Sequence, residues 1–348
     1  MTPHPEIFAR LESPSGPPTV LSKMEFLPPD RKHDTLCIGV TSGIHGDELN
    51  GIYICALLSE FFTALSQTSA KTALRAKIKI VSSVNPPGIN NSVRFWPFDE
   101  TDINRMFPGY DRGETSQRVA GAVFNELSDL THLVDIHSSN MFVRESPQVR
   151  LYHHDKKTLT LARAFGLPVI WLREVTALET VHLSQTMSQA GKKTFVIQAG
   201  HALEIDKELC QNVARGILRW ISALGGLDRT AITKFAPSTK SKNTQQRVCI
   251  AGKKNVVFLS AETSGLFVAH DSIQFLKHKM VKKGELIGRI VDPVSGQTRE
   301  QVNSPVSGLL FTIRVHPIVY QGSLLARIAA SKNLPNRLIK KKTPQQPQ

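Results

Sequence analysis

The sequence predicts an α/β protein whose mostly parallel or mixed sheet is covered by helices on both faces, with a smaller all-β domain in its C-terminal part. Near-continuous apolar runs, which are typical of strands buried on both sides, alternate with amphipathic helical segments between residues 36 and 224. After a polar stretch at 237–246, only short β-type runs punctuated by glycine follow. A length of 348 residues with 41% hydrophobic content suffices for two or three domains and a sizeable core.

The expected elements follow the chain in four segments. Residues 1–34 are rich in proline and polar residues and are expected to form a leader with one edge strand. Residues 35–235 form the first domain, with strands at 36–41, 78–84, 133–136, 149–152, 169–172 and 195–199 and helices at 48–65, 116–127, 157–165, 182–190 and 207–224. Residues 236–330 form the β-rich domain, with strands at 248–251, 256–260, 265–269, 286–290 and 309–315. Residues 331–348 are expected to be a disordered basic tail.

Composition and charge exclude several classes of protein. No apolar run approaches eighteen residues, so no membrane span is expected, and the N-terminus lacks the pattern of a signal peptide. The four scattered cysteines indicate free thiols in a reducing compartment, so we expect a cytoplasmic protein. The net charge of +14 raises nucleic acid as a partner, but basic residues concentrate only in the tail, without a nucleic-acid motif. We expect instead that the positive charge attracts an anionic small molecule. Whether the chain forms a homo-oligomer is left open.

The most informative stretch is 43–51 (GIHGDELNG), between a predicted buried strand and a predicted helix. His45 and Glu48 are three residues apart, and Gly46 between them allows a tight turn. This spacing aims an imidazole and a carboxylate at one point, which suits a borderline-soft ion such as zinc. The alternative is that His45 packs in the core and Glu48 is a partner of the helix dipole.

A second histidine, His137, ends another predicted strand in the phrase Asp-Ile-His. A catalytic zinc site uses three protein ligands and leaves a fourth position open, and ligands collect at the carboxyl ends of parallel strands. His45, Glu48 and His137 complete such a set, so we expect one zinc ion per chain. Asp135 is expected to point to the opposite face of its strand and to have a structural or supporting role.

With these motifs the chain resembles the succinylglutamate desuccinylase/aspartoacylase family, a branch of the zinc carboxypeptidase fold. The matching segments are 43–51, 102–109 (DINRMFPG) and 135–137, within a resemblance over about residues 35–225. The resemblance implies a zinc-dependent amidohydrolase that removes an acyl group from a small N-acylated amino acid or amine. It also implies that the C-terminal β-rich domain is a noncatalytic cap that shapes the cleft.

A long irregular segment, 85–113, is expected between the second strand and the next helix, and unstructured segments of that length are usually functional. The resemblance implies that Arg94 and Arg105 hold a carboxylate or carbonyl oxygen of the substrate, with Asn104 beside them. A guanidinium fork suits a carboxylate. The alternative is that these arginines tie the segment to the sheet. Asp102 is expected to orient Arg105 or to cap a turn.

The chain departs from the family at the residue that transfers the proton. The family has a glutamate there, in a Glu-x-Gly phrase that ends a late strand, whereas this chain has Gln198. An amide does not accept a proton near neutral pH. Either Glu204 acts as a substitute base, or the chain is a metal-binding pseudoenzyme that binds a ligand with little hydrolysis. Glu204 also has an ordinary interpretation as a carboxylate at a helix N-terminus. The candidate catalytic residues are thus Gln198, Glu204 and Arg105.

Overall fold

A computed structural model describes residues 3–30, 36–235, 248–273 and 279–331. The strands are β1 (Glu6–Leu11), β2 (Thr19–Phe26), β3 (Cys37–Thr41), β4 (Lys77–Val81), β5 (His132–His137), β6 (Val143–Leu151), β7 (Val169–Leu172), β8 (Lys193–Gly200), β9 (Cys249–Ala251), β10 (Val256–Ser260), β11 (Gly265–Ala269), β12 (Met280–Val281), β13 (Leu286–Val291), β14 (Thr298–Asn303), β15 (Gly308–Arg314), β16 (Ile318–Val319) and β17 (Leu324–Ala330). The helices are α1 (Leu49–Ser66), α2 (Pro86–Asn91), the 3-10 helix η3 (Ile103–Arg105), α3 (Thr115–Glu126), α4 (Lys156–Ala164), α5 (Leu183–Gln189), α6 (Lys207–Ala223) and α7 (Arg229–Phe235).

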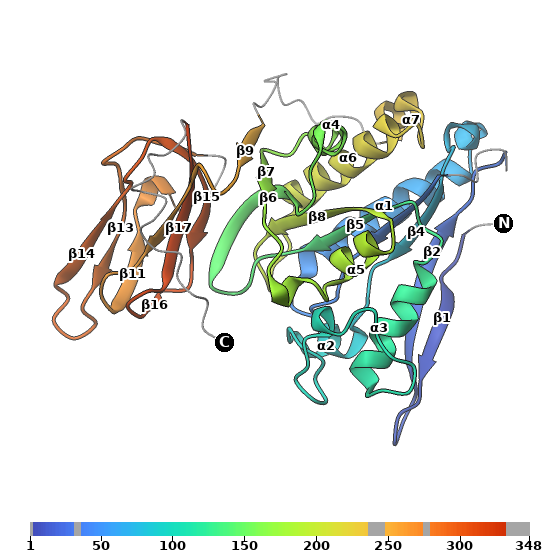
Figure 1. Ribbon diagram of the computed structural model, residues 1–348, viewed down its shortest axis with the longest axis horizontal. Coiled ribbons are helices and arrows are strands. Elements are labelled where there is room, and N and C mark those ends of the chain that lie inside the picture. Colours follow the sequence, from blue (N-terminus) through green and yellow to red (C-terminus); the bar gives the residue numbers. More distant parts are fainter. Residues whose placement is uncertain (1–2, 31–35, 236–247, 274–278, 332–348) are drawn as a thin grey trace.

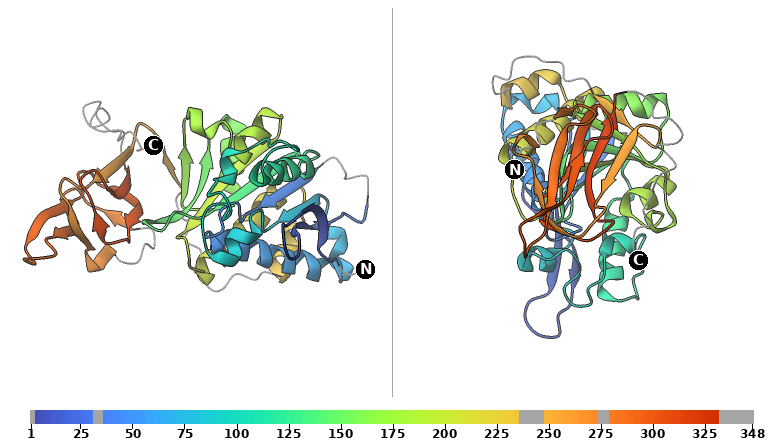
Figure 2. Two further views of the ribbon diagram at one scale, coloured as in Figure 1. Left: turned by 90° about the horizontal axis from the view of Figure 1, so that it is seen from below. Right: turned by 90° about the vertical axis from the view of Figure 1, so that its left-hand side faces the viewer.

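A mixed sheet runs through both lobes of the molecule (Figure 1). Its order is β1-β2-β4-β3-β5-β8-β6-β15-β17-β10, with β7 beside β6 and β9 beside β7. Strands β4, β3, β5 and β8 are parallel to one another, whereas β6 runs antiparallel to β8. A second sheet, β14-β13-β11-β16, completes the C-terminal lobe, which projects to one side of the helix-covered lobe (Figure 2). The predicted α/β fold with a mixed sheet and a C-terminal β-rich part is thus confirmed.

Helices cover both faces of the sheet in the N-terminal lobe. On one face, α1 and α6 bury Ile54 and Trp220 against the strands. On the other face, α3 and α5 pack against the sheet, where Leu183 of α5 and Leu133 of β5 share a core. Because alternate residues of a strand face opposite sides, His137 lies on the same face as Leu133. His137, at the end of β5, therefore lies on the face of the sheet that α5 covers.

Helix α1 is long and apolar enough to cross a membrane by length and composition alone, with a mean hydropathy of 1.4. In this fold it lies against the sheet, and its residues Ile54, Leu58 and Phe62 are buried in the core that it shares with α6. A core helix of a globular domain meets the same two criteria.

The predicted helices begin and end within one residue of α1, α3, α4, α5 and α6. Residues 1–34 contain two strands, β1 and β2, instead of one, and β2 pairs with β4. The strand expected at 149–152 begins at Val143, because β15 pairs with its first half. The segment expected to be irregular, 85–113, contains α2 and η3. The polar stretch at 237–246 and the tail beyond Ser331 lie outside the described residues.

The two lobes meet at Glu145, a buried carboxylate on β6 that is 2% exposed. Its oxygens accept hydrogen bonds from Arg150 on the same strand (2.8 Å) and from Arg327 on β17 (2.5 Å). Both guanidiniums stack on Trp171 of β7, with their central carbons 5.2 Å from its ring. Burial lowers the pKa of Arg327 to about 10, although Glu145 opposes this shift. The carboxylate therefore neutralises positive charge that is buried at the junction.

Glu145→Gln keeps the shape of this side chain and removes its charge, so both guanidiniums should lose their counter-ion. We expect the free energy of unfolding to fall by about 3 kcal/mol, measured by urea denaturation of the full chain. Glu174→Gln is the matched control, because Glu174 pairs with Lys253 of the C-terminal part (3.1 Å) but is 74% exposed. A loss below about 1 kcal/mol is expected there. Equal losses in the two variants would show that the buried ion pairs of Glu145 contribute no more to the free energy of unfolding than the exposed pair of Glu174.

Candidate metal centre

The turn between β3 and α1 positions His45 and Glu48. A Cβ atom on residue 46 would lie 2.1 Å from the carbonyl carbon of Gly88 in α2, so only glycine fits there. Glu48 is the N-cap residue of α1, yet its side chain makes no capping hydrogen bond. The close approach of α2 therefore fixes the turn, and the Glu48 carboxylate is available to face His45 and the sheet.

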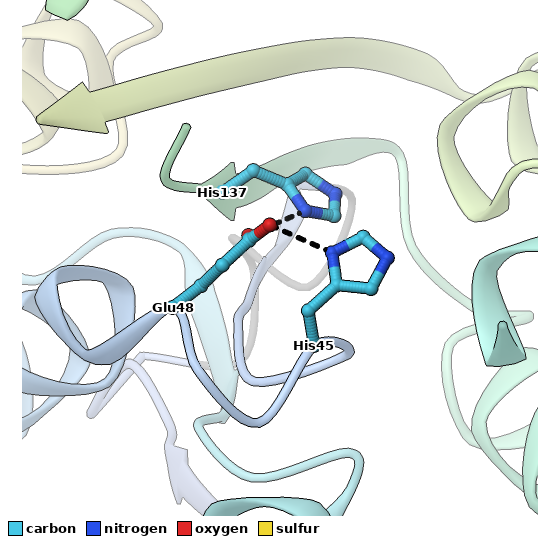
Figure 3. Close-up of side chains that lie close together, drawn as sticks. All are labelled: His45, Glu48 and His137. Carbon is cyan, nitrogen blue, oxygen red and sulfur yellow. Dashed lines mark hydrogen bonds and ion pairs between the residues drawn. The ribbon is translucent and has the colours of Figure 1, made fainter. Parts of the chain in front are cut away.

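His45, Glu48 and His137 converge on one point (Figure 3). Their potential ligand atoms all lie within 4.8 Å of one another, and all three residues are buried. Nδ1 of His45 is 2.8 Å from one carboxylate oxygen of Glu48, and Nδ1 of His137 is 2.9 Å from the other. The backbone N–H of Ser138 also donates to Glu48 at 2.9 Å. The structure thus brings together the three residues predicted as metal ligands.

The second nitrogen of each imidazole faces another carboxylate. Nε2 of His45 lies 3.0 Å from Asp102, and Nε2 of His137 lies 3.0 Å from Asp135. A carboxylate in this position holds the proton on Nε2 and leaves the Nδ1 lone pair for a metal. The expectation that Asp135 points away from His137 was wrong, because residues two apart on a strand share a face. The hydroxyl of Thr41 donates to Asp135 at 2.8 Å and fixes it further.

The charges of this cluster depend strongly on one another. Burial alone would raise the pKa of Glu48, but His45 and His137 hold it well below its usual range. Burial alone would lower the pKa of His137, but Asp135 and Glu48 raise it to about 10. A cation suits a point where carboxylate charge collects, and metal binding releases the imidazole protons. Two imidazoles with inward Nδ1 atoms and one carboxylate therefore fit a zinc ion.

Arg94 and Arg105, the two arginines predicted to bind substrate, differ in how far their guanidinium groups are already hydrogen-bonded. Arg94 donates to Glu48 at 2.8 Å, and its backbone carbonyl accepts the N–H of Gly46 at 3.1 Å. Arg94 therefore braces the turn that carries the candidate ligands. Arg105 is less engaged, because its Nε lies 3.8 Å from Asp102 and its side chain is 38% exposed. Arg105 thus has guanidinium N–H groups to offer to a ligand, whereas those of Arg94 are partly used.

Residues 102–104 link the long segment to the centre and to α5. Asp102 caps η3 by accepting the N–H of Asn104 at 3.0 Å, as predicted, and it also binds His45. Burial alone would raise the pKa of Asp102, but His45 holds it below its usual range. The side-chain oxygen of Asn104 accepts the N–H of Leu183 at 3.1 Å. Half of the Asn104 amide is therefore committed to α5, and only its NH₂ group could face a substrate.

Gln198 lies beside His137, because the two residues are in register on the parallel strands β8 and β5. In-register residues on neighbouring strands share a face at a separation of about 5 Å. Gln198 is 5% exposed, so its amide is buried next to a candidate metal ligand. The position that the sequence singled out as a departure is thus adjacent to the centre.

Glu204 is placed differently from both interpretations of the sequence. Its carboxylate pairs with Arg144 at 2.7 Å and is 31% exposed. The interpretation as a helix N-terminal carboxylate was wrong, because α6 begins at Lys207 and is capped by Asp206. Within the described residues, no hydrogen bond or ion pair joins Glu204 to the three candidate ligands.

Three polar residues of the α5 face with buried side-chain atoms were not predicted as site residues: Gln148, His182 and Gln185. Gln148 on β6 is in register with Gln198, and neither its oxygen nor its nitrogen has a partner within the described residues. Nε2 of His182 and Nε2 of Gln185, at the start of α5, also lack one there. Burial, helped by Arg105 and His137, lowers the pKa of His182 to about 4. The sequence feature that could have identified these residues is a polar side chain within an otherwise apolar strand or on the apolar face of a helix.

The catalytic-domain model of the succinylglutamate desuccinylase/aspartoacylase family matches residues 35–224. Among curated proteins, the chain is similar to N-alpha-acetyl-L-2,4-diaminobutyric acid deacetylase of Halomonas elongata, with 28% identity over 138 residues, 37% of each protein. It is also similar to succinylglutamate desuccinylase of Pseudomonas fluorescens Pf-5, with 24% identity over 210 residues, 55% of this chain and 58% of that protein. These matches cover 37% to 58% of the length of the curated relatives.

Solved structures share the fold over nearly the whole chain. The succinylglutamate desuccinylase/aspartoacylase of Rhodobacter sphaeroides superposes with a TM-score of 0.74 at 18% identity, over 95% of this chain and 96% of that one. The product-bound ectoine utilization protein EutE (DoeB) of Ruegeria pomeroyi gives a TM-score of 0.72 at 18% identity, over 95% and 99% of the two chains. The likeness establishes the fold of both lobes.

Proposed function

Because the chain belongs to the succinylglutamate desuccinylase/aspartoacylase family, we propose that it is a zinc-dependent deacylase. Its reaction would be hydrolysis of the linear amide bond of a small N-acylated amino acid or amine. The observation that carries the proposal is the buried convergence of His45, Glu48 and His137, with both Nδ1 atoms directed at the carboxylate. The names of the curated relatives, a deacetylase and a desuccinylase of amino acids, support this substrate class.

His45, Glu48 and His137 would hold the zinc ion, one per chain. Zinc at such a site supplies Lewis acidity toward a carbonyl oxygen and toward water. Asp102 and Asp135 keep the protons of the two imidazoles on Nε2, so that both Nδ1 lone pairs stay directed inward. Each ligand is thus oriented by a partner outside the metal shell, which favours tight retention of the ion.

The anionic end of the substrate would be held by Arg105, whose side chain is 38% exposed and only loosely paired. Arg94 would assist from the turn, and the free NH₂ group of Asn104 would lie beside them. Charge-assisted hydrogen bonds to a carboxylate are stronger than neutral ones. The net charge of +14 would also attract an anionic substrate. We place the protein in the cytoplasm, since its four cysteines are free and three of them are buried.

Proton transfer is the step with the least support from the residues present. Gln198 can hold a water molecule by hydrogen bonds, but it cannot take the proton of that water. Glu204 would have to leave Arg144 to act. The second candidate function is therefore a metal-binding module that binds its ligand with little hydrolysis, and the observation that favours it is Gln198 in register with His137.

The test combines metal analysis with a panel of N-acyl amino acids. We expect about one zinc per purified chain, hydrolysis that disappears after chelation, and hydrolysis that returns when zinc is added back. Hydrolysis by the chelated protein would contradict the zinc-dependent deacylase. Ligand binding by the zinc-loaded protein without turnover would favour the binding module.

Arg105→Ala should weaken binding of ligands that carry a carboxylate by about 10²-fold and should affect neutral analogues much less, since the lost hydrogen bonds are charge-assisted. The dissociation constants of matched carboxylate and amide ligands would be measured by calorimetry with zinc-loaded protein. Arg112→Ala is the control, because Arg112 is an exposed arginine of the same long segment. If Arg105→Ala weakens both ligand types equally, Arg105 has a structural role instead.

A further inference from the structure

A row of amides extends from the metal centre toward the C-terminal lobe. His137 on β5 is in register with Gln198 on β8, and Gln198 is in register with Gln148 on β6. Since in-register residues share a face and neighbouring strands are about 5 Å apart, the two amides continue the face of His137 for about 10 Å. The row lies on the face that α5 covers.

The amide of Gln148 is fully buried, and its oxygen and nitrogen both lack a partner within the described residues. Nε2 of Gln185, on α5, is a further buried amide nitrogen without a partner there. Buried polar groups in native proteins are almost always hydrogen-bonded, because an unmade bond is costly. Unsatisfied amides on the face of the sheet that carries His137 therefore indicate that a ligand completes their hydrogen bonds.

Several guanidiniums near the Gln148 end of this row already face carboxylates within the described residues. Four guanidiniums of β6, β17 and the residue after β7 each have a carboxylate partner: Arg144 with Glu204, Arg150 and Arg327 with Glu145, and Arg173 with Glu179. Nε of Arg144, Arg150 and Arg327 lacks a hydrogen-bond partner within the described residues, but each of these guanidiniums already faces a carboxylate, so a carboxylate ligand placed here would lose its hydration beside an existing negative charge. A carboxamide offers both a donor and an acceptor, so it matches a neutral group that has both.

We propose that Gln148, one strand beyond Gln198, forms a subsite for a neutral hydrogen-bonding group, a hydroxyl or a carboxamide, at the distal end of the acyl chain. Arg105 takes the anionic amino-acid end of the same substrate. The inference rests on the proposed deacylase function and narrows its substrate class to N-acyl amino acids with an uncharged polar acyl group. Gln148 is thereby the residue that decides between an uncharged and a charged acyl end.

Two substrates that differ only at the acyl end test the subsite: N-succinamoylglutamate, which ends in a carboxamide, and N-succinylglutamate, which ends in a carboxylate. For the zinc-loaded full chain we expect kcat/KM to favour the carboxamide by at least about tenfold. Gln148→Met, which keeps the size and removes both hydrogen-bonding atoms, should bring the ratio to about one, and Gln148→Asn should retain part of the preference. Gln211→Leu, at an exposed glutamine of α6, should leave the ratio unchanged.

Binding of succinamate and succinate, the acids that hydrolysis would release, tests the subsite without turnover. Calorimetry on zinc-loaded protein should give about tenfold tighter binding of succinamate, and Gln148→Met, or Gln148→Leu if the former does not fold, should remove the difference. If no variant hydrolyses either substrate but this difference is present, the deacylase function fails and the subsite stands. Tighter binding of succinate, or equal weakening of both acids by Gln148→Met, would overturn the subsite even with robust hydrolysis.

Discussion

His45→Ala/His137→Ala should lose its metal completely, from about one zinc per chain to none, and with it all hydrolysis of N-acyl substrates. Two of the three proposed ligands disappear, and a lone carboxylate does not hold zinc against dialysis. Glu48 would keep its contacts with Arg94 and the Ser138 N–H, so its charge would be neutralised by protein groups. Metal content would be measured by inductively coupled plasma mass spectrometry after dialysis, and turnover in the same samples.

His153→Ala/His154→Ala is the matched control for this double variant, because it also removes two imidazoles. Both residues are exposed just beyond β6, so this protein should retain its zinc. The single variants His45→Ala and His137→Ala should each retain little zinc, since each loses one of the three proposed ligands. Full zinc occupancy in His45→Ala/His137→Ala would sink the assignment of the centre.

The sequence was most informative where the chemistry is local. The spacing of His45 and Glu48 lies within one strand-turn-helix passage, and the strand that ends at His137 is apolar enough to be recognised alone. Their convergence also follows from sequence, since parallel strands bring their carboxyl ends to one edge. These three residues could therefore be predicted to converge from the order of strands and helices alone.

Contacts between distant segments could not be predicted in the same way. Asp102 binds His45 across 57 positions of sequence, and nothing near Asp102 indicates this partner. The first half of β6 exists as a strand because β15 of the C-terminal lobe pairs with it. A register shift between Glu145 and Gln148 then decides which side chains of β6 face α5. Gln148 lies on the face of His137 for this reason, and the sequence does not reveal the register shift.

Gln198→Glu is expected to raise hydrolysis of N-acyl substrates by about 10²-fold or more, because it restores the carboxylate that the family has at this position. The substitution is nearly isosteric, and the residue is in register with His137 beside the centre. A carboxylate near a bound cation stays ionised, since the positive charge favours the charged form. It could then take the proton from the attacking water and pass it to the leaving amine. Zinc content should not change.

The competing explanation gives the opposite pattern in the same assay. If Glu204 is the working base, Glu204→Gln should abolish wild-type turnover and Gln198→Glu should add little. The Arg144 partner of Glu204 disfavours this explanation, because Glu204 would have to break this ion pair to reach the centre. We therefore expect low but measurable wild-type activity that rises in Gln198→Glu, and that rises in the double variant as well. Robust wild-type turnover that survives Glu204→Gln would contradict both explanations, since the proton would then be carried by another carboxylate or by the substrate itself.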